Sequence, residues 1–123
     1  MNTFRYDAYD FFTPLKAALN TTIEGITIAN SASHSINLPR SIDDPDAPVI
    51  MKWLKIFTWR GNGDGINPQK NGIIEDCFIR TNDDSTYVNG LAIRRVVYWV
   101  DSNGSILIFS AIGITAKILV IIL

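Results

Sequence analysis

Residues 74–79 read Ile-Glu-Asp-Cys-Phe-Ile, and the same arrangement of apolar positions occurs three more times along the chain. In each copy an apolar residue is followed by two other residues, and then by two apolar residues with one position between them. The copies are Ile23/Ile26/Ile28, Met51/Leu54/Ile56, Ile74/Cys77/Ile79 and Ile93/Val96/Tyr98, at spacings of 28, 23 and 19 residues. A unit of this length that recurs along a chain indicates a stacked architecture.

Each copy is short, rich in β-branched residues and followed by turn-forming residues, at 30–33, 60–65, 81–85 and 101–105. The unit is too short for a propeller blade, and it lacks the leucine and asparagine pattern of a leucine-rich repeat. We therefore predict an all-β fold: a right-handed parallel β-helix (solenoid), present as a fragment of about four coils. The last two apolar residues of each motif should point inward and stack from coil to coil.

This pattern divides the chain into three parts. Residues 1–22 do not follow it and are expected to form an irregular N-terminal segment, residues 23–105 should form the coils, and residues 106–123 an apolar C-terminal tail. Residues 40–48, which carry three acids and two prolines, are interpreted as a solvated loop inserted between coils. The tail is nearly long enough to span a bilayer, but Lys117 lies inside it and buried strands of a further coil explain it equally well. We expect no membrane attachment.

Composition narrows the classes of function. The chain has 123 residues, enough for one domain, with 47% hydrophobic and 19% charged residues and a net charge of -1. Its basic residues are scattered among acids, which argues against a nucleic-acid partner. The only cysteine, Cys77, excludes an internal disulfide and is expected to be a buried, inert thiol. No secretory signal begins the chain, although sequons at Asn20 and Asn103 are compatible with an extracellular parent protein.

Two of the turns carry a candidate site. Asp64 ends one turn, and Asp83 and Asp84 lie in the next, about one coil further along the chain. Stacked coils should therefore bring the three carboxylates together. Like charges at close range make one carboxyl retain its proton as a general acid, while ionised neighbours can activate water. Separations of ~6.5 to 9.5 Å would suit inverting glycoside hydrolysis.

Simpler explanations exist for the same residues. Asn, Asp and Gly are ordinary turn formers, so backbone geometry alone also accounts for them. Residues 61–65, Gly-Asn-Gly-Asp-Gly, are faintly similar to calcium-binding loops, but an EF-hand alignment puts Arg60 at the first ligand and Asn71 in place of glutamate. We therefore predict no metal and no cofactor. His34, the only histidine, is interpreted as a surface or hydrogen-bonded residue of a different turn.

The turns and the strands between them resemble a known family. Residues 59–68 read Trp-Arg-Gly-Asn-Gly-Asp-Gly-Ile-Asn-Pro, and residues 71–85 read Asn-Gly-Ile-Ile-Glu-Asp-Cys-Phe-Ile-Arg-Thr-Asn-Asp-Asp-Ser. These segments, with Tyr-Trp at 98–99 and Asp-Ser-Asn-Gly-Ser at 101–105, resemble glycoside hydrolase family 49, the dextranases and isopullulanases. The resemblance covers roughly residues 22–105 and implies a parallel β-helix that hydrolyses α-glucan with inversion. It also implies Asp83 as the general acid and Asp64 and Asp84 as the bases that activate water.

The resemblance implies a secreted parent enzyme with a polysaccharide substrate, and we expect a monomer. Tyr87, Trp59 and Trp99 are candidates for substrate binding because aromatic faces suit sugar rings. Polygalacturonases share the fold and the acidic layout, but this chain has no histidine after Asp84, where that family carries one. Two alternatives stay open: a pectin hydrolase, and a noncatalytic solenoid that binds carbohydrate. The sequence does not decide which glucan linkage is cleaved.

Overall fold

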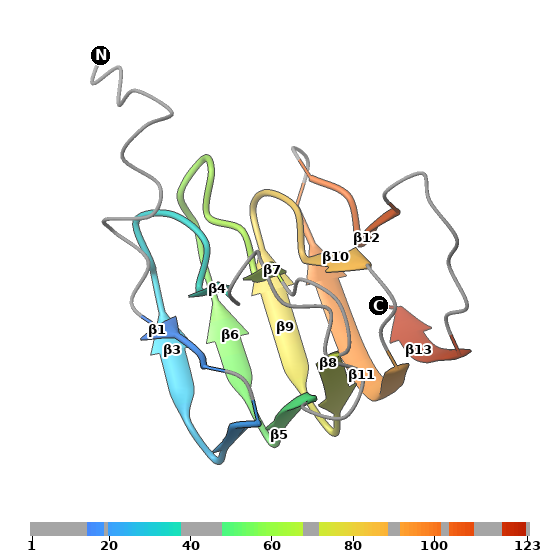
Figure 1. Ribbon diagram of the computed structural model, residues 1–123. Coiled ribbons are helices and arrows are strands. Elements are labelled where there is room, and N and C mark those ends of the chain that lie inside the picture. Colours follow the sequence, from blue (N-terminus) through green and yellow to red (C-terminus); the bar gives the residue numbers. More distant parts are fainter. Residues whose placement is uncertain are drawn as a thin grey trace.

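The structure is a computed structural model that describes residues 15–18, 20–37, 48–67, 72–88, 92–101, 104–109 and 117–122. Within these ranges all regular elements are β-strands, and no helix is present. All of the strand pairings are parallel, and the strands form a curled arrangement in which successive passes of the chain lie side by side (Figure 1). The predicted all-β class is confirmed.

In the described residues, thirteen strands form two sheets. They are β1 (Leu15–Lys16), β2 (Thr22–Glu24), β3 (Thr27–Ala29), β4 (Ile36–Asn37), β5 (Val49–Lys52), β6 (Lys55–Phe57), β7 (Ile66–Asn67), β8 (Gly72–Glu75), β9 (Phe78–Thr81), β10 (Thr86–Val88), β11 (Ala92–Val100), β12 (Leu107–Phe109) and β13 (Lys117–Ile122). One sheet has the order β1-β4-β7-β10-β12. The other has the order β2-β5-β8-β11-β9-β6-β3, with β13 also paired to β11.

The sheet order shows that the chain repeats one path. We call each pass a rung: rung 1 is β2, β3 and β4, rung 2 is β5, β6 and β7, rung 3 is β8, β9 and β10, and rung 4 is β11 and β12. Strands at the same place in neighbouring rungs are hydrogen-bonded partners. The long β11 serves two places, because its first half pairs with β8 and its second half with β9.

The register of the strands reproduces the spacing of the sequence motif. One column of paired residues is Ile23, Met51, Ile74 and Ile93. A second column is Ile28, Ile56, Ile79 and Tyr98. The spacings of 28, 23 and 19 residues are therefore the lengths of successive rungs, which confirms the stacking of like positions.

The core lies between these columns. In rungs 2 to 4 the third motif residues, Ile56, Ile79 and Tyr98, are fully buried. The first motif residue is buried as well, which extends the prediction that only the last two would point inward. Ile26 departs from that prediction, because 37% of it is exposed where the chain leads into β3, the edge strand of its sheet. Fully burying such a side chain contributes roughly 1.5 to 3 kcal/mol, so the columns are the main source of stability.

A left-handed backbone residue marks the same corner in each rung. Gly25, Trp53, Asp76 and Arg95 have φ of 68°, 55°, 54° and 50°. The hydrogen-bond ladder continues through this corner, because the N–H groups of Gly25, Trp53 and Asp76 donate to carbonyls of the next rung. That conformation costs a non-glycine residue about 1 to 2 kcal/mol, so the ladder holds Trp53 and Asp76 in a backbone that non-glycine residues rarely adopt.

Several expectations concern the ends of the chain. Strand β1 lies inside residues 1–22, expected to be irregular, and β12 and β13 lie inside the apolar tail. Residues 40–47 of the expected inserted loop lie outside the described residues. Cys77 is buried, as predicted, and its burial raises the pKa of the thiol to about 11. In the described part of the chain, no helix has the length and apolar character needed to cross a bilayer.

Candidate active site

Three turns stack at one corner of the rungs. The turn between β6 and β7 carries Asp64, the turn between β9 and β10 carries Asp83 and Asp84, and residues 104–105 precede β12. Backbone hydrogen bonds tie them together: Gly65 donates to the Asp84 carbonyl and Ser85 donates to the Ser105 carbonyl, each at 2.9 Å. The two acidic turns are thus held by the same ladder that forms the sheets.

Two glycines allow these turns to approach each other closely. A Cβ atom on Gly65 would lie 2.2 Å from the carbonyl oxygen of Ser85, in the next rung. A Cβ atom on Gly104 would lie 2.1 Å from the carbonyl carbon of Asp83 and 2.3 Å from its oxygen. Backbone atoms cannot move aside as the end of a flexible side chain can. The glycines are therefore required by the packing of one turn on the next.

Asp83 is held by backbone donors on both of its oxygens. Its Oδ2 accepts the N–H of Asn62 at 3.0 Å, from the rung below, and its Oδ1 accepts the N–H of Asp84 at 2.9 Å. Burial, followed by the negative charge of Asp64, raises the pKa of Asp83 above its ordinary value. These effects outweigh the two hydrogen bonds, which lower the pKa. Asp83 therefore has the tendency to keep its proton that a general acid needs.

Tyr87 joins the other two carboxylates. Its hydroxyl lies 2.8 Å from Oδ2 of Asp64 and 3.2 Å from Oδ2 of Asp84, as a donor to each. The phenol has one proton to donate, so the two carboxylates share it. Burial and the two neighbouring carboxylates raise the pKa of Tyr87, which keeps the phenol protonated.

The other carboxylate oxygen of Asp84 also accepts a hydrogen bond. Its Oδ1 accepts the N–H of Ser105 at 2.9 Å, from rung 4. Asp64 is only 5% exposed. The structure thus gathers Asp64, Asp83 and Asp84 in one cluster built from adjacent rungs, as the spacing of the turns predicted. Their chemical roles stay predictions.

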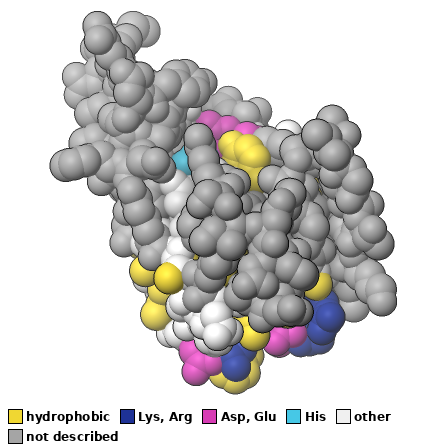
Figure 2. Space-filling model, in the orientation of Figure 1, with side chains coloured by type: hydrophobic (Ala, Val, Ile, Leu, Met, Phe, Trp, Pro, Cys, Tyr) yellow, Lys and Arg dark blue, Asp and Glu magenta, His cyan; other side chains and the backbone are white. Residues whose placement is uncertain are grey.

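His34 belongs to this cluster, which the sequence interpretation missed. Its Nδ1 lies 3.2 Å from Oδ2 of Asp64, and its side chain is 15% exposed. Its ring meets the ring of Tyr87 edge-on, with centroids 5.8 Å apart. Figure 2 shows the histidine beside acidic side chains on one face of the molecule.

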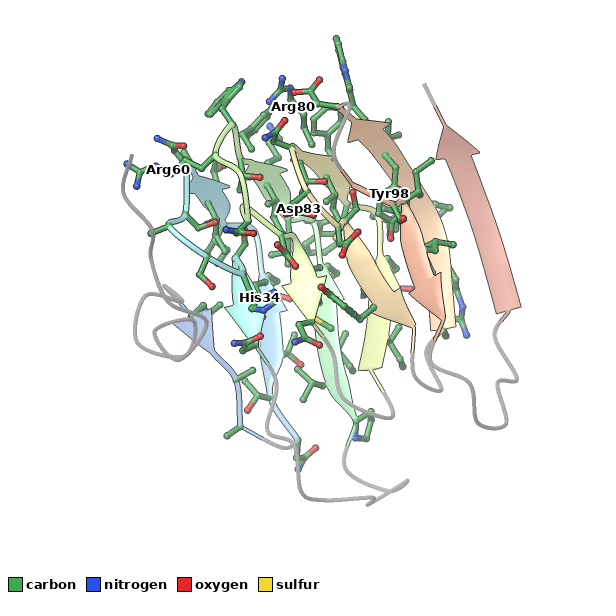
Figure 3. The ribbon with its side chains drawn as sticks, turned by 90° about the horizontal axis from the view of Figure 1, so that it is seen from above. His34, Arg60, Arg80, Asp83 and Tyr98 are labelled. Atoms are coloured by element: carbon green, nitrogen blue, oxygen red, sulfur yellow. The ribbon has the colours of Figure 1, made fainter. Side chains whose placement is uncertain are left out.

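Trp59 and Trp99 lie on a different face. Both are exposed, at 56% and 50%, on the outer side of the sheet formed by β6, β9 and β11. Arg80 connects them: its guanidinium lies over the Trp59 ring at 5.1 Å, and its backbone pairs in register with Trp99. Figure 3 shows Arg80 apart from His34 and Asp83. The structure thus places Tyr87 at the carboxylates and the two tryptophans on the outer sheet face.

Comparisons with known proteins add no relative. No protein-family model, no curated protein and no solved structure matches this chain. Across the described ranges, no group of three or more His, Cys, Asp or Glu side chains is arranged to hold a metal ion. The carboxylate cluster and the resemblance of its turns are the features of this chain that point to a function.

Proposed function

We propose that this protein is an inverting glycoside hydrolase that acts on α-glucan and that its rungs belong to a right-handed parallel β-helix. The observation that carries the proposal is the cluster itself. Asp83, whose pKa is raised, lies beside two carboxylates that share one phenol proton. One protonated carboxyl and ionised partners are the groups that inverting hydrolysis requires. The parallel register of four rungs supports the β-helix.

In this mechanism Asp83 gives its proton to the glycosidic oxygen as the bond from that oxygen to the anomeric carbon breaks. A water molecule attacks the same carbon from the opposite face of the ring and forms the new bond. Asp64 and Asp84 orient this water and accept the proton that it releases. Because the water enters opposite the leaving group, the anomeric configuration inverts.

The aromatic residues divide into two proposed roles. Tyr87 contacts both bases, which supports a contact between its ring and the sugar bound beside them. Trp59 and Trp99 offer exposed rings on the outer sheet face, where the apolar face of a sugar can stack. The charge of Arg80 between them is paired with Asp101 at 2.5 Å, which suits a neutral polysaccharide better than a polyanion.

The test is release of reducing sugar from dextran, pullulan and polygalacturonate by the wild type and by Asp83→Asn. Asparagine cannot donate the proton, so turnover should fall by at least about 100-fold. The matched control is Asp76→Asn, a change at the half-buried left-handed corner, where asparagine tolerates the backbone and only the contact with Arg95 on the surface is weakened. This control should retain activity.

The alternatives predict different results. Activity on polygalacturonate alone would favour a pectin hydrolase and overturn the α-glucan assignment. Binding of dextran or pullulan without release of reducing ends would favour a noncatalytic carbohydrate-binding protein. Full activity of Asp83→Asn would remove this residue from the mechanism.

A further inference from the structure

The register of the five-stranded sheet places His34 in the same column as the bases. Ile36 pairs with Ile66, and Ile66 pairs with Thr86. The residues two positions earlier are His34, Asp64 and Asp84, so these three occupy equivalent places on rungs 1, 2 and 3. The next strand continues the pattern, because Thr86 pairs with Leu107, two positions after Ser105.

Each of the two bases is contacted by the neighbouring rung that does not carry the other base. Asp84 receives the N–H of Ser105 from rung 4, and Asp64 has His34 from rung 1 at 3.2 Å. Tyr87 lies between the two bases and contacts both. In the described part of the chain, the side-chain contacts of Asp64 with His34 and Tyr87 both fall on Oδ2. Oδ1 of Asp64 takes part in neither contact.

We propose that His34 is a positioning residue for Asp64, a role that rests on the proposed function. The 3.2 Å contact has the distance of an ion pair but not the alignment of a hydrogen bond. With a proton on Nδ1, the imidazole stabilises the negative charge on Oδ2, and a small rotation of the ring toward Oδ2 would fix the plane of the carboxylate. Oδ1 then points to the water that the base activates. A carboxylate held from two sides loses less freedom when the water and substrate bind, which favours turnover.

The surroundings of His34 are acidic. The imidazole contacts the Asp64 carboxylate and the Tyr87 phenol. The phenol also contacts Asp84, so the next charge in the column is negative too. Both favour a ring that carries its proton toward Asp64, because a negative neighbour attracts the positive end of the N–H dipole.

The contact can be measured without any hydrolysis, because the chain has a single histidine. Long-range ¹H–¹⁵N NMR of the full chain at about pH 8 reports which ring nitrogen is protonated. We expect Nδ1 to carry a proton in the wild type, and Asp64→Asn to change the nitrogen shifts. An unprotonated Nδ1, or shifts that are identical in Asp64→Asn, would overturn the proposal.

The catalytic consequence is measured with two substitutions, using reducing-sugar release. His34→Ala should lower kcat by about 10-fold to 100-fold and change KM by less than about 3-fold, because the base loses its orientation while the sugar contacts remain. His34→Asn places an amide N–H near the position of Nδ1 and should restore most of kcat.

These results separate the two proposals. If Nδ1 is protonated next to Asp64 but the wild type releases no sugar, the contact stands and the proposed function fails, and the positioning role fails with it. If the wild type is active and His34→Ala matches it in kcat, only the role of His34 fails. If His34→Asn is as impaired as His34→Ala, donation from the Nδ1 position is not what His34 supplies.

Discussion

Replacing Gly104 by alanine should separate the turn of rung 4 from the acidic turn beneath it. The added Cβ would lie 2.1 Å from the carbonyl carbon of Asp83 and 2.6 Å from its Cα, so the two turns must move apart. That movement breaks two hydrogen bonds of 2.9 Å, from Ser105 N–H to the Asp84 carboxylate and from Ser85 N–H to the Ser105 carbonyl. A bond to a charged group contributes about 1.5 to 3 kcal/mol and a neutral one about 1 kcal/mol, so the loss should be about 3 kcal/mol.

Urea denaturation followed by circular dichroism measures this loss, with Gly61→Ala as the matched control. A Cβ on Gly61 would meet no atom within 4 Å, so that variant should stay within about 0.5 kcal/mol of the wild type. Activity should fall along with stability in Gly104→Ala because Asp84 loses its donor from rung 4. If Gly104→Ala proves as neutral as Gly61→Ala, the turns do not pack on each other and the geometry of the site is wrong.

Three other predictions follow from burial, titration and exposure. Ile79→Ala should cost about 2 to 5 kcal/mol in urea denaturation, because Ile79 is fully buried, whereas Ile26→Ala, at a residue 37% exposed, should cost clearly less. The raised pKa of Asp83 means that its contribution to stability is present below about pH 4 and is lost as pH rises through the folded-state pKa. The wild type should therefore lose stability relative to Asp83→Asn as pH rises above about pH 4, and a constant difference would contradict the shift. Trp59→Ala and Trp99→Ala should raise KM for a long glucan more than they lower kcat, and unchanged kinetics in both would exclude sugar binding on the outer face.

The fold follows from the sequence because parallel stacking forces like positions together. Strands in register stack the same motif residue of each rung in one buried column. These positions must therefore all be apolar. That constraint made the pairing of Met51 with Ile74 readable from spacing alone. The left-handed backbone of the corner residues Trp53 and Arg95 could not be anticipated, because neither residue type favours that conformation.

The sequence predicted the site residues only where a turn contains aspartates. The acidic turns identified the carboxylates, and the spacing placed them within one rung of each other. The register adds the detail that Asp84, rather than Asp83, stacks on Asp64. His34 was missed although a signal existed: Ser-Ile-Asn follows it at 35–37, and Gly-Ile-Asn follows Asp64 at 65–67. Matching those segments would have placed the histidine beside the base.

The stereochemistry of hydrolysis tests the central claim most directly. Proton NMR during the first minutes of reaction on dextran or pullulan resolves the anomer that is released before mutarotation mixes the two forms. Protonation by Asp83 and attack by a water held at Asp64 and Asp84 predict that the new reducing end appears first as the β-anomer. First appearance of the α-anomer would mean a covalent intermediate and retention, which contradicts this arrangement of one acid and two bases.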